Sequence, residues 1–226
     1  MPVTKARSTR KSIRSRAGSG AHSIYKGRLG SLRRVLRSRG LDALVVTNPV
    51  DIRYLTGFSG EASYALVTRA QLWVISDFRF QEELAELKGL AKVHIRKGDI
   101  IAALGEVAKG MNLKAIGLQS EHLAHSTATR IAKLLGVKNM APTTGILNDL
   151  RQIKDDSELK SIQAAVKIQQ NALVATLEQI DAGMTELEIT AILEYEMKAR
   201  GSTDPAFGSI VAAGANGSLP HAIPGK

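Results

Sequence analysis

The feature that most constrains the fold is the alternation of two apolar patterns over residues 29–142. Short runs of apolar and β-branched residues alternate with segments whose apolar residues recur every three or four positions. The first pattern is typical of buried strands and the second of amphipathic helices. Strands are expected at 43–47, 63–68, 71–76, 91–95 and 114–118, and helices at 29–39, 78–87, 100–108 and 121–135. This order predicts an α/β domain with a mostly parallel or mixed sheet, in which Arg69 and Ala70 join one hairpin.

The pattern changes after residues 142–150, which are expected to form a linker. Two long helical patterns follow, and each opens with the residue spacing of a capping box, Asp155 with Glu158 and Thr185 with Glu188. A strand of small and β-branched residues is expected at 207–213. The sequence therefore predicts an α/β domain at 29–150 and a second, helix-rich part at 151–226.

The basic charge is concentrated at the N-terminus. Eight of the 31 basic residues and none of the 21 acidic residues lie in 1–28, so this segment carries +8 of the net charge of +10. It is poor in apolar residues, and we expect it to be a disordered tail. We favour a solvated extension, or an upstream region misread as coding; an organelle transit peptide and an electrostatic contact with nucleic acid stay open. This segment has a single aromatic residue, Tyr25, and no recognisable binding module, so we do not expect nucleic acid to be its partner.

Composition excludes several classes of function. The chain has no cysteine, so it forms no disulfide and has no thiolate chemistry, which fits a reducing compartment. No apolar run is long enough to cross a bilayer. Neither a Gly-x-Gly-x-x-Gly motif nor a Walker loop is present, so nucleotide binding has no support.

Polar side chains gather directly after the strand at 43–47. Asn48 and Pro49 stop that strand, because proline has no N–H for a ladder and restricts the residue before it. Asp51 and Arg53 should therefore lie on a loop at a strand end, where α/β proteins place their sites. The alternative is a structural turn with a surface ion pair, and spacing alone favours it.

Histidines supply two further candidates. His122 and His125 lie three residues apart on an expected helix, a spacing that could hold one metal ion; without a third ligand nearby we favour an exposed helix surface. His221 follows Pro220 on a loop and suits a proton donor or a hydrogen-bond donor to a developing oxyanion. The alternative for His221 is an ordinary surface histidine.

Three segments together resemble the creatinase, prolidase and aminopeptidase P family. Residues 48–60, Asn-Pro-Val-Asp-Ile-Arg-Tyr-Leu-Thr-Gly-Phe-Ser-Gly, resemble the signature of its N-terminal domain. Residues 76–80, Ser-Asp-Phe-Arg-Phe, resemble its Thr-Asp-x-Arg-Tyr motif, and residues 150–159 resemble the segment that opens its catalytic domain. The resemblance covers 29–226. It implies a creatinase-type, ribonuclease H-like N-terminal domain, followed by the start of an α+β pita-bread domain.

The resemblance also implies an activity. The intact parent would be a cytoplasmic Xaa-Pro metallopeptidase that cleaves proline-containing peptides before proline with two divalent ions (manganese, cobalt or zinc). His221 corresponds to the family's first active-site histidine and would steady the tetrahedral intermediate. The family forms homodimers or tetramers in which one subunit's N-terminal domain borders its neighbour's site, and Asp51 and Arg53 are our candidates for that border.

The chain departs from the family in one respect. The metal ligands of the peptidases, two Asp, one His and two Glu, follow the histidine that corresponds to His221, and this chain ends at Lys226. No metal ligand is assigned here, and we expect an N-terminal fragment that is inactive alone. A metal-free, creatinase-like amidinohydrolase and a non-catalytic binding module with the peptidase fold, as in some histone chaperones, are the alternatives.

Overall fold

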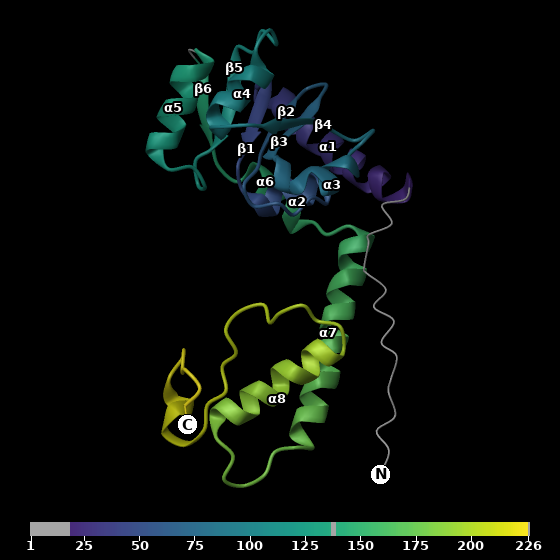
Figure 1. The fold of residues 1–226 in the computed structure, drawn as a ribbon, viewed down its shortest axis with the longest axis vertical. Coiled ribbons are helices and arrows are strands. Elements are labelled where there is room, and N and C mark those ends of the chain that lie inside the picture. Colours follow the sequence, from purple (N-terminus) through teal and green to yellow (C-terminus); the bar gives the residue numbers. More distant parts are fainter. Residues whose placement is uncertain (1–18, 137–138, 226) are drawn as a thin grey trace. The chain divides into compact units, whose positions relative to one another are not determined.

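The computed structural model describes residues 19–136 and 139–225 (Figure 1). The chain divides between Ile153 and Lys154 into two compact units, and each is described by itself. The first helix, α1, spans Ser19–Ser38. The disorder expected for 1–28 is therefore wrong for residues 19–28, which are helical, whereas 1–18 lie outside the described residues. The C-terminal half of α1 packs into the core through Leu29, Leu32 and Leu36, and Arg28, just before it, donates a hydrogen bond to the carbonyl of Tyr54 at 2.8 Å.

The described part of the first unit contains a six-stranded sheet in the order β4-β3-β2-β1-β5-β6. Strand β2 runs antiparallel to β1 and β3, and the other neighbouring strands are parallel, so the expected mixed sheet is confirmed. The strands are β1 Ala43–Val46, β2 Tyr64–Thr68, β3 Leu72–Asp77, β4 Lys92–Arg96, β5 Ala115–Gln119 and β6 Asn139–Thr143.

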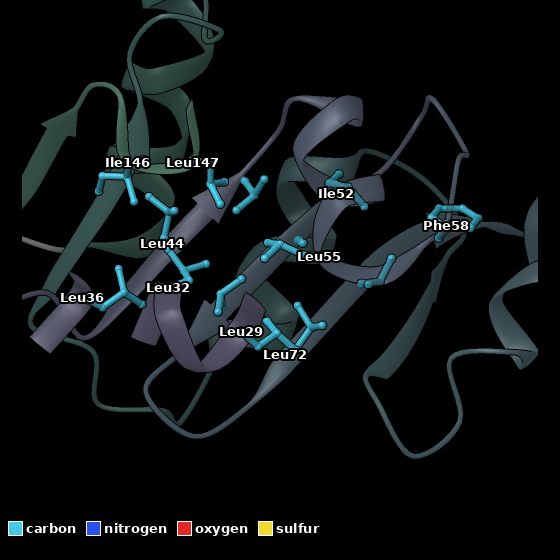
Figure 2. Close-up of a cluster of buried hydrophobic side chains, with 14 of the residues drawn as sticks. Leu29, Leu32, Leu36, Leu44, Ile52, Leu55, Phe58, Leu72, Ile146 and Leu147 are labelled. Atoms are coloured by element: carbon cyan, nitrogen blue, oxygen red, sulfur yellow. The ribbon is translucent and has the colours of Figure 1, made fainter. Parts of the chain in front are cut away.

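Helices cover both faces of the sheet. They are α2 Pro49–Thr56, the 3-10 helix η1 Phe78–Phe80, α3 Gln81–Ala85, α4 Ile100–Ala108, α5 His125–Leu135 and α6 Ile146–Gln152. Leu44 of β1 faces a core built with α1, α2 and α6 (Figure 2). Its neighbour Val45 faces a second core built with α4 and α5. Strand β1 is therefore buried on both faces, which explains its uninterrupted apolar sequence.

Local patterns predicted most elements of this unit correctly. The expected hairpin is present, with Val67 opposite Leu72 at the closed end, and α4 spans the expected 100–108. The helix expected at 121–135 starts only at His125, so its predicted start is wrong. Residues 121–124 form a turn instead, because the N–H groups of His122 and Leu123 both donate to the carbonyl of Gln119.

The linker expected at 142–150 is wrong. Pro142 belongs to β6, and α6 follows directly. Proline argues against a central strand, but β6 is an edge strand, where a missing N–H is tolerated. Ile146 and Leu147 of α6 are buried in the core shared with α1, so this segment is an integral part of the first unit.

The second unit consists of α7 Asp156–Leu177, α8 Glu186–Ala199, the 3-10 helix η2 Gly214–Ser218 and irregular chain. Both predicted capping boxes are present. The strand expected at 207–213 is wrong, because in the described residues this segment has no neighbouring strand to supply ladder hydrogen bonds. None of the described helices combines the length and hydropathy that a bilayer crossing requires.

Candidate functional site

The motif that follows β1 is a short, fully capped helix. The side chain of Asn48 accepts a hydrogen bond from the N–H of Val50 at 3.0 Å, and Pro49 occupies the first helical position, where its missing N–H costs nothing. Gly57 ends the helix with φ of 79°, and its N–H donates to the carbonyl of Arg53 at 2.7 Å. These local bonds give α2 a fixed direction at the carboxyl end of β1.

Asp51 lies on the inner face of α2 and is 1% exposed. Its carboxylate accepts a hydrogen bond from Gln119 Nε2 at 2.7 Å and one from the Arg151 guanidinium at 3.0 Å. The side-chain carbonyl of Gln119 accepts in turn from the N–H groups of Thr47 and Asn48, at 2.8 and 3.1 Å. The expected surface ion pair is therefore a buried network that joins α2 to β1, β5 and α6.

Arg53 has the opposite environment. It is exposed, and its side chain makes no ion pair or hydrogen bond with any residue that the structure describes. Two positions apart on a helix place side chains on different faces, so the structure does not bring Asp51 and Arg53 together. Of the two candidates, only Arg53 has a side chain accessible to a substrate or a neighbouring subunit.

A second charged cluster lies at the carboxyl ends of β3 and β4. The Nε and Nη2 atoms of Arg79 donate to the carboxylate of Asp77, at 2.9 and 2.7 Å, and Arg96 donates to it at 3.0 Å. The hydrogen bonds from Arg79, followed by the charges of Arg79 and Arg96, lower the pKa of Asp77 to about 2. Phe78, between the two paired residues, is 74% exposed. The second motif therefore places an exposed aromatic ring between the two residues of an ion pair, Asp77 and Arg79.

The histidine pair does not form a metal site. His122 Nε2 lies 3.0 Å from the side-chain nitrogen of Asn48, and His122 precedes α5, whereas His125 is its first residue. Within residues 19–136 and 139–225, no three His, Cys, Asp or Glu side chains are grouped so that they could hold a metal ion. The residues present therefore do not fit the two-metal centre that the resemblance implies.

His221 belongs to the second unit and is exposed. It lies between η2 and Gly225, directly before Ala222, which is 5% exposed. This segment contacts Glu186, the first residue of α8, which the sequence did not single out. The sequence likewise did not indicate that Gln119 and Arg151 are the hydrogen-bond partners of Asp51. Arg151 stood in a motif that we noted, but no local pattern indicates its contact with Asp51.

The comparisons with known proteins agree with the three motifs. Residues 28–153 match the family described as Creatinase/Prolidase N-terminal domain, and residues 160–226 match Metallopeptidase family M24. A Xaa-Pro dipeptidase from Pyrococcus furiosus is 30% identical over 201 residues, which are 88% of this chain and 56% of that protein.

Solved structures give the same result. A Xaa-Pro dipeptidase from Bacillus anthracis matches with a TM-score of 0.83 and 28% identity, over 89% of this chain and 56% of that one. An X-Pro aminopeptidase from Thermotoga maritima matches with a TM-score of 0.76 and 32% identity, over 85% of this chain and 56% of its own. The chain thus spans little more than half the length of these relatives.

Proposed function

The chain belongs to the creatinase/prolidase N-terminal domain family, and on this premise we propose that it is the N-terminal part of a Xaa-Pro peptidase. Such an enzyme is a hydrolase that cleaves the peptide bond before proline. One observation carries the proposal: the structure matches a Xaa-Pro dipeptidase from Bacillus anthracis over 89% of this chain, with a TM-score of 0.83.

His221 is the proposed catalytic residue of this part. A neutral imidazole N–H can donate a hydrogen bond to the oxygen of the scissile carbonyl as negative charge develops on it. The exposure of His221 supports this role, because its ring is accessible to a substrate. In the proposed reaction, water attacks the carbonyl carbon and forms a C–O bond, the C–N bond to proline breaks, and a proton from the water passes to the departing proline nitrogen.

We propose distinct roles for the two candidates on α2. The exposed Arg53 would border the neighbouring subunit's site in a homo-oligomer. Asp51 would act indirectly, because its buried carboxylate fixes the helix that presents Arg53. In this proposal a guanidinium held on a capped helix attracts the carboxylate of a peptide substrate.

The proposed parent enzyme uses two divalent ions, manganese, cobalt or zinc, which would polarise the carbonyl and activate water. The residues described here do not make that centre, so we assign no ligand in this chain. Residues 1–226 by themselves are accordingly proposed to be inactive. The proposed compartment is the cytoplasm.

Joining this chain to a relative tests the proposal directly. Residues 1–226 are fused in frame to the part of the Bacillus anthracis Xaa-Pro dipeptidase that lies beyond the matched region. The fusion is assayed with Xaa-Pro dipeptides and Arg-Pro-Pro in the presence of Mn²⁺. We expect hydrolysis by the fusion and none by 1–226 alone.

Two variants of the fusion give the result its meaning. His221→Ala should lower kcat by about 10²- to 10³-fold, the usual loss for one oxyanion donor. Lys167→Ala, an exposed residue of α7, serves as the matched control. Creatine hydrolysis without metal would instead indicate the amidinohydrolase, and a folded fusion that cleaves neither substrate would contradict an enzymatic role.

A further inference from the structure

The carboxylate of Glu186 accepts hydrogen bonds from three different residues of one segment. One oxygen accepts from the N–H of Ala213 at 2.7 Å, and the other from the N–H of Gly225 at 2.8 Å. The side-chain amide of Asn216 donates to both oxygens, at 3.2 and 3.0 Å. Glu186 is held in turn at the first position of α8, directly after the capping residue Thr185.

These bonds close a loop that contains His221. Ala213 and Gly225 lie at the two ends of residues 213–225, and the carbonyl of Gly225 also accepts from the N–H of Leu187 at 3.1 Å. Of the side chains in this segment only Ala222 is buried. A loop with so little apolar burial depends on its hydrogen bonds for a fixed conformation.

A carboxylate suits this position for a chemical reason. All of its partners are N–H donors, and an ionised carboxylate offers acceptors only. The N–H groups of Gly225 and Ala213, with the Asn216 amide, hold the pKa of Glu186 below its usual range, so it stays ionised at neutral pH. A glutamine would set an NH₂ group against these donors, and an aspartate is one methylene shorter.

We propose that Glu186 is a positioning residue that fixes the loop carrying His221, and thereby the direction in which its imidazole is presented. The inference rests on the catalytic role proposed for His221. It adds a residue that acts through that histidine and touches no substrate itself.

The test uses the full 226-residue chain and needs no turnover. Glu186→Gln keeps the size of the side chain but removes half of its acceptors. Glu188→Gln is the matched control, because Glu188 lies in the same helical turn and bonds to Thr185, with no bond to 213–225 in the described residues. Amide hydrogen exchange is measured by mass spectrometry, and the ring signals of His221 are followed by NMR and assigned with His221→Gln.

In Glu186→Gln, the amides of 213–225 should exchange at least about tenfold faster than in the parent chain, the factor expected from losing one charge-assisted hydrogen bond. The His221 ring signals should move toward those of an unstructured peptide. In Glu188→Gln, amide exchange in 213–225 should stay within about twofold of the parent chain, and the His221 ring signals should keep their chemical shifts. The hydrogen bonds between Glu186 and 213–225 are intact in this variant. Unchanged exchange and unchanged ring signals in Glu186→Gln would overturn the proposal.

A second variant covers the case in which Glu186→Gln loosens α8 itself, visible as faster exchange in 186–199. Asn216→Ala removes the hydrogen bonds from the Asn216 side-chain amide to Glu186 and changes no residue of α8. It must also accelerate exchange in 213–225 and shift the His221 signals, or the proposal fails. The two proposals fail separately: an active His221→Ala fusion refutes the role of His221, whereas an ordered loop in Glu186→Gln and Asn216→Ala refutes positioning by Glu186 alone.

Discussion

The carboxylate of Asp51 on α2 accepts a hydrogen bond from the guanidinium of Arg151 on α6, at 3.0 Å and across 100 residues of sequence. This bond connects the motif at residues 48–60 to the start of the motif at 150–159. It also closes the first unit, because α6 is the last element before the division at Ile153. Residues 48–60 and the first residues of the second motif, 150–153, are therefore parts of one packed unit.

Loss of this pair should destabilise the first unit. Asp51→Ala leaves Arg151 and the buried amide of Gln119 without their acceptor, and should lower the free energy of unfolding by about 3 kcal/mol. Arg53→Ala, on the exposed face of the same helix, should change it by less than about 0.5 kcal/mol. Urea denaturation of both variants measures the difference, and equal midpoints would contradict the assignment of Asp51 to a buried network.

Acid should weaken the contribution of Asp77. The pKa of the Asp77 carboxyl is about 2 in the folded chain and 3.8 for an unperturbed aspartate, the value taken for the unfolded chain. The folded state therefore binds the proton less readily than the unfolded state. The stability that Asp77 confers is complete above the pKa of the unfolded chain and is lost as the pH falls from about 4 to about 2. Asp77→Asn should therefore be less stable than the parent at pH 6, and this difference should shrink as the pH approaches 2.

Thermal midpoints across this pH range, with Glu61→Gln as a control for an exposed carboxylate, provide the measurement. If the difference in thermal midpoint between the parent and Asp77→Asn stays constant from pH 6 to pH 2, the hydrogen bonds from Arg79 to the Asp77 carboxylate do not stabilise the fold.

Gly57 should resist substitution for two reasons. Its φ of 79° strains any residue with a Cβ, and that Cβ would overlap the Tyr25 hydroxyl. Gly40 has a similar φ of 68° with open space around it. Gly40→Ala should cost about 1–2 kcal/mol from backbone strain alone, and Gly57→Ala should cost clearly more. Chemical denaturation compares the two, and adding Tyr25→Ala should recover part of the Gly57→Ala loss; no recovery would contradict the overlap.

The first unit should fold without the second only if α6 is kept. A chain of residues 1–153 retains both apolar cores and the Asp51–Arg151 pair, so it should unfold cooperatively. A chain of residues 1–145 loses Ile146 and Leu147 from the core, each worth about 1.5–3 kcal/mol, together with Arg151. Calorimetry should show a markedly lower midpoint for 1–145, and equal midpoints would restore 142–150 as a linker.

The sequence by itself determined the elements whose signals are local. The hairpin from Tyr64 to Asp77, helix α4 and the capping boxes at Asp155 and Thr185 were all predicted, because apolar period, turn residues and capping hydrogen bonds act within a few positions. The motifs also identified the family, since their order along the chain is a property of the sequence alone.

Only the tertiary structure decided the rest. Strand β6 and helix α6 form where the local sequence predicted a linker, because a neighbouring strand and an apolar core stabilise them. Asp51 is a buried anchor because Gln119 and Arg151, far along the chain, converge on it. The role of Glu186 as a positioning residue is likewise visible only in the tertiary structure, because its hydrogen-bond partners follow it by 27 to 39 residues. Such contacts leave no periodic pattern in the sequence, since their geometry exists only after distant segments have packed together.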